Sequence, residues 1–173
     1  MSFTGTTTED DAQGPDLQQQ VADLNSRLHL TDVRVQRLEA EAHQDPPFDV
    51  HRIQIHMSAS EVLLEPPRFA ARFSQTVELQ DSEETTLAHV EVAVVVDYTL
   101  DDGPLPSGEA VTAYVENNSY FAAHPYLRET LQSATMRLGL EPVVLGVLGR
   151  GQPRPTEINM VRRVPVSMSE EMD

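Results

Sequence analysis

The residues that could carry chemistry in this chain are its histidines and its many carboxylates. The six histidines are His29, His43, His51, His56, His89 and His124. None of them has the spacing of a metal-binding motif such as HExxH. His51 and His56 are separated by an odd number of positions on an expected strand, so they point to opposite faces. We therefore expect no bound metal.

Other catalytic signatures are missing from the sequence as well. The chain has no cysteine, so it has neither disulfides nor thiolate chemistry. Gly146, Gly149 and Gly151 lack the preceding strand and the following helix that a phosphate-binding loop needs. There is no GxSxG sequence for a nucleophile elbow. The sequence predicts a protein that is not an enzyme and needs no cofactor.

The composition favours one acidic domain with tails. The chain has 173 residues, of which 12 are basic and 28 acidic, and its net charge is −16. This charge argues against nucleic acid and anionic membrane surfaces as partners. No apolar window approaches the roughly 18 residues of a membrane span, and the polar N-terminus lacks a signal peptide, which favours a cytoplasmic location. We expect disordered tails at 1–14 and 150–173 around a domain at 15–149.

The stretch from Ser119 to Leu148 is expected to organise the fold. Four apolar residues at helical spacing predict one stripe along a long helix. These residues are Leu127, Leu131, Ala134 and Leu138. Gly139 is expected to end the helix in the left-handed conformation, and Pro142 keeps the next residues extended. The apolar run from Val143 to Leu148 must then pack on the domain or await a partner.

Four strands are expected before this helix, at 31–43, 48–57, 68–80 and 85–100. The third strand alternates apolar and polar residues cleanly. The second changes phase between Val50 and Ile53, which indicates a bulge or twist. The fourth has one apolar face and one half-apolar face that includes Val95. It is therefore expected to be central in the sheet or covered by a partner.

The segment that precedes these strands allows two interpretations. Pro15 and Asp16 suit the first turn of a helix. Apolar residues then recur at heptad spacing from Leu17 and can be followed to Ala42, as in a coiled coil. The β-branched residues from Thr31 onwards favour a strand instead. We prefer a helix at 16–29 and a strand at 31–43, and a coiled-coil adaptor is the alternative.

One motif resembles a known family. The sequence Pro125-Tyr126-x-Arg128-Glu129 opens the long helix, which Pro142 and a short apolar run follow. With the four upstream strands, this arrangement is similar to the SecB family of export chaperones over roughly residues 31–148. It is most similar to the actinobacterial SecB-like branch, whose members work beside toxin–antitoxin pairs.

The resemblance implies an α+β fold, in which a long helix packs on a four-stranded antiparallel sheet, and assembly as a dimer of dimers. It implies a chaperone that keeps unfolded clients from aggregating, with possible hand-over to the SecA motor. A dedicated chaperone for one antitoxin is the alternative. Glu91 falls where the family contacts SecA. However, Ala42 and Pro46 stand where the family has acids, and a Pro-broken tail replaces its second C-terminal helix.

The expected strands and helix offer more apolar surface than one small domain can bury. We therefore expect a groove that binds extended non-native chains by burying their apolar side chains or by strand addition. Its predicted lining is Ile53, Ile55, Met57, Val143, Leu145 and Val147. The alternative is that the run from Val143 to Leu148 is ordinary core. The uncovered face of the fourth strand is expected to form the contact of a homotetramer.

Overall fold

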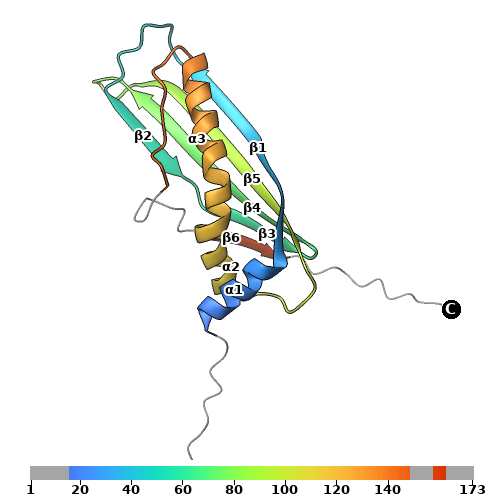
Figure 1. Ribbon diagram of the computed structural model, residues 1–173. Helices are drawn as coiled ribbons and strands as arrows, with labels where there is room; N and C mark the ends of the chain where they lie inside the picture. The colour runs from blue at the N-terminus through green and yellow to red at the C-terminus, as the bar shows by residue number, and fades with distance from the viewer. Residues whose placement is uncertain (1–15, 149–157, 163–173) are drawn as a thin grey trace, which may run out of the picture.

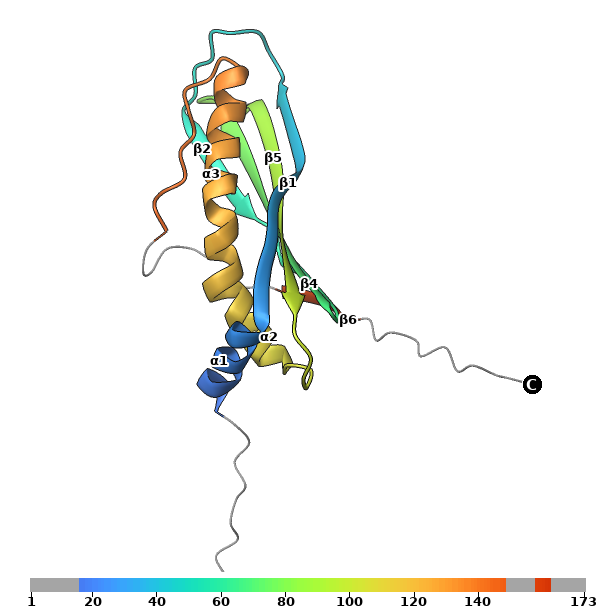
Figure 2. The same cartoon turned by 45° about the vertical axis from the view of Figure 1, so that its right-hand side comes forward.

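The computed structural model describes residues 16–148 and 158–162. It shows an α+β fold of two layers, in which a helical layer lies against one face of a six-stranded sheet (Figure 1, Figure 2). The predicted fold class, a sheet with a long helix packed on it and an extra N-terminal helix, is confirmed. The predicted tail at 1–14 lies outside the described residues.

A short helix opens the described chain, five strands follow it, and the long helical segment precedes the last strand. In chain order the elements are α1 (Leu17–Arg27), β1 (Leu28–Ala42), β2 (Arg52–Met57), β3 (Ser60–Glu65), β4 (Arg68–Gln80), β5 (Thr86–Leu100), α2 (Gly108–Tyr114), the π-helix η1 (Val115–Ser119), α3 (Tyr120–Arg137) and β6 (Ile158–Arg162).

The N-terminal segment is a helix followed by a strand, as preferred from the sequence. Leu28 is already extended, with φ −94° and ψ 120°, so α1 stops there and a coiled coil through 43 is excluded. The guanidinium of Arg27 donates hydrogen bonds to the carbonyls of Asp101 and Pro104, each at 3.0 Å. These bonds tie the end of α1 to the loop that follows β5.

The central strands β4 and β5 have the predicted bounds almost to the residue, but the second strand is divided. The sheet order is β1-β5-β4-β3-β6, and β2 pairs with β4 as well. β2 pairs with one half of β4 and β3 with the other, so the two form one arm that is interrupted at Ser58 and Ala59. The strand expected at 48–57 is also shorter than predicted, because β2 starts only at Arg52.

The strand β6 corrects the prediction of a tail over 150–173. Its residues run parallel to β3, whereas all the other pairings are antiparallel. Ile158 and Met160 pack against the core, and Asn159 between them is exposed, which is the alternation of a strand. The rest of the predicted tail, at 150–157 and 163–173, lies outside the described residues.

The helical layer is one uninterrupted helix from Gly108 to Arg137, in which η1 is a π-helical bulge. Ser107 caps its start, because its Oγ accepts a hydrogen bond from the Ala110 amide at 3.2 Å. The segment at 108–118, which the sequence left open between helix and loop, is therefore helical. The predicted stripe is buried except for the half-buried Leu138, and Gly139 has the expected positive φ of 79°.

The outer face of the sheet, away from the helices, is closed without a partner. Val95 is buried on this face, although none of the described helices covers it. It lies in a hollow that is rimmed by Arg34, Arg68 and Arg72, and long basic side chains shield apolar surface with their aliphatic stems. The expectation that another subunit must cover Val95 is thus not met, because the chain already covers this residue itself.

Candidate functional site

The candidate site follows the edge of β2 that pairs with no other described strand. Ile53, Ile55 and Met57 pair with β4 residues that are buried on the helix side of the sheet. Since paired residues share a face, these three side chains also point to the helix side. Ile53 and Ile55 are 50% and 45% exposed there, and Met57 is half-buried. The predicted apolar face of β2 is therefore open at the margin that α3 does not cover.

The segment after α3 runs back alongside that helix, on the side of β2 (Figure 1, Figure 2). Val143 and Leu145 are only 5% and 8% exposed and belong to the core, whereas Val144 and Val147 are 46% and 74% exposed. The Val143 amide donates to Thr135 Oγ1 at 3.1 Å, which fixes the start of the segment. The expectation that Val143 and Leu145 are open to solvent in the groove is wrong, while Val147 is open.

Two hollows continue the open face of β2. The first, of about 640 Å³, lies between the segment before β2 and the turn after α3. Its apolar lining includes Phe48, Val50, Ile53, Leu140 and Pro142. The second, of about 260 Å³, lies between β2, α3 and the segment after α3. Its apolar lining includes Ile55, Met57, Val144, Leu145 and Leu148. Ile53 and Ile55 thus carry one apolar track along β2 from the first hollow to the second.

Three of the four motif residues line another hollow, of about 360 Å³, on the outer side of α3. Pro125, Arg128 and Glu129 meet Phe121 and Val147 there, whereas Tyr126 is exposed and does not line it. Phe121 is also exposed, and it was not among the residues predicted to bind a client. The sequence signal for Phe121 is an aromatic residue in the long helix that does not belong to the buried apolar stripe.

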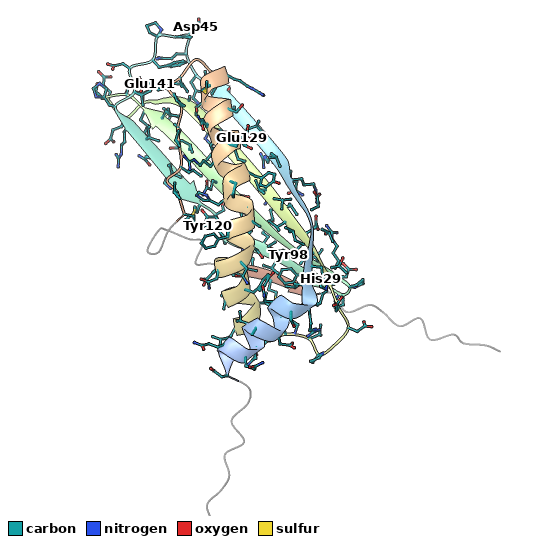
Figure 3. All side chains as sticks on the ribbon, in the orientation of Figure 1. His29, Asp45, Tyr98, Tyr120, Glu129 and Glu141 are labelled. Carbon is teal, nitrogen blue, oxygen red and sulfur yellow. The ribbon has the colours of Figure 1, made fainter. Side chains whose placement is uncertain are left out.

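His124 lines both the hollow on the outer side of α3 and the hollow beside β2, and Tyr120 lines the latter; neither residue was among the predicted groove residues. Tyr120 projects from α3 on the side of β2 (Figure 3), where its hydroxyl lies 3.2 Å from Gln75 Nε2 and 3.5 Å from Met57 Sδ. The ring of His124 meets the Tyr120 ring edge-on, with the centroids 5.8 Å apart. Burial lowers the pKa of His124, and the charge of Arg128 adds to the effect. His124 is therefore a neutral part of the wall at pH 7.

The outer face of the sheet has a different chemistry, because ion pairs such as those of Arg37, Arg68 and Arg72 lie on it. The carboxylate of Glu91 lies 3.2 Å from Arg37, which also binds Glu39 at 2.8 Å. Glu91 therefore shares a single arginine with Glu39, and the three side chains together keep a net negative charge. Its role as a contact for SecA stays a prediction.

Asp97 is the most buried acid of this outer face. It accepts hydrogen bonds from Arg34 and from Arg68, the latter at 2.8 Å. Burial by itself would raise the pKa of Asp97, but the bonds and charges of the two arginines outweigh it and hold the pKa below its usual value. The outer face is thus a set of satisfied ion pairs around buried apolar residues, and the open apolar surface lies on the helix side.

The described residues contain no group of three histidine, aspartate or glutamate side chains that could hold a metal ion. Two exposed pairs join His29 to Asp101 at 2.9 Å and His51 to Asp49 at 3.3 Å. In the same part of the chain, no helix combines the length and apolar character that crossing a bilayer requires.

Comparisons with known proteins agree with this arrangement. No family model matches the sequence. The SecB-like chaperone Rv1957 of Mycobacterium tuberculosis strain H37Rv is 28% identical over 169 residues, which cover 85% of this chain and 92% of the relative. Its counterpart in the CDC 1551 / Oshkosh strain gives the same values. A solved structure of Rv1957 in complex with a ChAD peptide from the Rv1956 HigA1 antitoxin has a TM-score of 0.68 and 25% identity, and covers 78% of this chain and 99% of that one.

Proposed function

Because this chain is a homologue of the SecB-like chaperones and has their fold, we propose that it holds non-native polypeptides in the groove along β2. The solved relative is bound to an antitoxin peptide, so we propose that the preferred client is a segment of an antitoxin. General holding of unfolded chains for export is the second branch of the proposal. The homologues are chaperones, in agreement with the prediction that the protein is not an enzyme.

The observation that carries this proposal is the exposed apolar track. Ile53 and Ile55 are large apolar side chains that stay open beside the two hollows along β2, and Val147 stays open at the adjoining hollow on α3. Burying an apolar client side chain there contributes about 1.5–3 kcal/mol. Several such contacts give useful affinity with little dependence on sequence. The net charge of −16 keeps a protein with this exposed surface from associating non-specifically.

The antitoxin branch has better support than hand-over to SecA. Glu91 is half-buried and its carboxylate lies 3.2 Å from Arg37, so it is already engaged within the chain. The acids expected in the first strand of the family are absent at Ala42 and Pro46. Both observations concern export and leave the groove intact. We place the activity in the cytoplasm, where chains in need of holding are synthesised.

We also propose a homotetramer built as a dimer of dimers, with its first contact at β1 instead of Val95. β1 ends the sheet, and its 15-residue outer edge pairs with no other strand in the described part of the chain. Leu30, Val35 and Leu38 form an exposed apolar stripe on its helix side. A second copy that pairs through the same edge would cover the stripe and satisfy the free main-chain groups.

Two binding measurements test the function. The purified protein should suppress light scattering by a substrate diluted from guanidinium chloride, and it should bind the HigA1 ChAD peptide in a fluorescence titration. An unfolded substrate should compete with the peptide. Suppression without peptide binding would favour the general holdase, and failure of both would refute the proposal.

Multi-angle light scattering tests the assembly. Leu38→Asp should reduce the mass of the particle, because it places a charge in the proposed contact. The matched control is Val144→Asp, since Val144 is similarly exposed but lies in the segment after α3, beside β2. Equal masses for Leu38→Asp and the unsubstituted protein would refute the β1 contact.

A further inference from the structure

The edge of β3 that β6 occupies stands out because the chain provides its own occupant for it. β6 has five residues, and among the described strands it pairs only with β3 (Figure 1). We infer that this edge is a second client-binding surface, at which an extended client segment takes the place of β6. The inference rests on the proposed function and extends the binding site beyond the groove.

The main-chain pairing explains why another segment could replace β6. The register runs in parallel from Ser60–Ile158 to Leu64–Arg162. Hydrogen bonds between main chains do not depend on the side chains, so any extended segment can make them. An exchange of β6 for a client strand therefore replaces one set of bonds with an equivalent set.

The side chains of β6 show which client chemistry fits. Ile158 and Met160 pack against the core edge, beside Ser60 and Val62, and Asn159 points to the opposite, exposed face. A client must therefore be extended, with apolar side chains at alternate positions and polar ones between them. Non-native chains from β-structures carry this pattern.

β6 is also an imperfect occupant. Ser60 is completely buried, and its Oγ has no hydrogen-bond partner in the described structure. Ile158 stands opposite Ser60 in the register and offers no polar group to it. A client with a hydroxyl or amide side chain at this position would satisfy the serine. Such a client would gain a bond that β6 cannot make, which favours the exchange.

The location connects this edge to the groove. β2 and β3 use the same side to pair with β4, so their opposite sides form one continuous edge of the arm. β6 covers only the β3 half of that edge, and among the described strands none covers the β2 half. A client that lies beside Ile55 and Met57 in the groove would meet β6 if it continued along the arm.

A reversible crosslink tests the exchange, because the natural chain has no cysteine. Glu61→Cys with Asn159→Cys places a disulfide across a register pair of β3 and β6. The control, Gln54→Cys with Glu78→Cys, crosslinks β2 to β4 and leaves β6 free. Affinity for the HigA1 ChAD peptide and for a fluorescent unfolded substrate is measured for each full-length protein, oxidised and reduced. Met160→Asp, which loosens β6, is measured beside them.

We expect the oxidised β3–β6 protein to bind about tenfold more weakly than its reduced form, about 1.4 kcal/mol, and the control to be unaffected. Met160→Asp should bind more tightly than the unsubstituted chain. Equal affinities for the oxidised and reduced β3–β6 protein would overturn the inference, since β6 would then be a permanent cover. Disulfide-linked dimers of the β3–β6 variant would also overturn the inference, because β6 would then pair with β3 of a second copy of the chain and not yield to a client. Loss of binding by every form, including the unsubstituted chain, would refute the proposed function itself.

Discussion

The two faces of β5 are both buried, but by different means. On the helix side, α3 covers a row of valines from Val90 to Val96. On the outer side, Val95 is buried among arginines that pair with acids such as Asp97. Neither face therefore has apolar surface to spare at its centre. Exposed apolar residues lie instead at the two margins of the helix side: those along β2 and the segment after α3 are where we propose that clients bind, and the stripe on β1 is where we propose the subunit contact.

In the segment after α3, the same contrast between buried and exposed apolar residues occurs at Leu145 and Val147. Substitutions at these two positions give the largest expected difference in folding stability. Leu145→Ser should lower the free energy of unfolding by about 2–5 kcal/mol, because it leaves a cavity and buries a hydroxyl. Val147→Ser, at an exposed position, should change it by less than about 0.5 kcal/mol. Urea denaturation of both variants measures the difference. Similar urea midpoints for the two variants would mean that Leu145 is not more buried than Val147.

The ion pairs of the outer face can be disrupted by substituting Asp97. Asp97→Asn should lower the free energy of unfolding at pH 7 by about 1–2 kcal/mol, a modest value because Arg34 and Arg68 are about half exposed. The pKa of Asp97 is lowered by folding, so its contribution is complete above the unfolded pKa of 3.8 and is lost as the pH falls through the folded pKa.

Urea denaturation at pH 7, 5 and 3 measures this difference between Asp97→Asn and the unsubstituted chain. The difference should be the same at pH 7 and 5 and smaller at pH 3. Asp32→Asn is the matched control, because Asp32 also binds Arg34 but is half exposed. It should have little effect, and an equal loss at Asp32 would contradict the role of burial.

The open margin can be tested at Ile55. Ile55→Ser should weaken the binding of an unfolded client by roughly 1–2 kcal/mol, since one apolar contact is lost. Its folding stability should fall by less, because the side chain is already half exposed. Isothermal titration beside urea denaturation separates the two effects. Leu105→Ser, at an equally exposed position after β5, is the control and should leave client affinity unchanged.

The elements that the sequence predicted well are those with a strong internal pattern. β4 alternates and β5 has an unbroken apolar face, so their bounds were clear, and the stripe of α3 was equally clear. The segment from Val143 to Leu148 contains only apolar residues and Gly146, so nothing in it marked an inner and an outer side.

Two other features depend on distant contacts. The five residues of β6 are too few to show a period before they meet β3. The hollows at Phe121 and His124 form only when the segment after α3 packs back on its helix. Ile53, Ile55 and Val147 are exposed as expected, but the sequence could not show which of their neighbours were buried.

The smallest expected effect concerns His124, which lies between the hollow beside β2 and the hollow on the outer side of α3. Burial and the charge of Arg128 lower its pKa in the folded protein, so the unfolded chain takes up a proton first as the pH falls. Stability should therefore decrease as the pH falls from about 6.5 towards the folded pKa, and not below it. In His124→Gln this part of the pH dependence should disappear, whereas the exposed His56→Gln should keep it. Urea midpoints at pH 7.5, 6.5 and 5.5, above the range in which Asp97 titrates, measure the slope. An unchanged slope in His124→Gln would show that another group is responsible for this pH dependence of stability. It would also mean that water reaches His124 well enough to hydrate a charged imidazole.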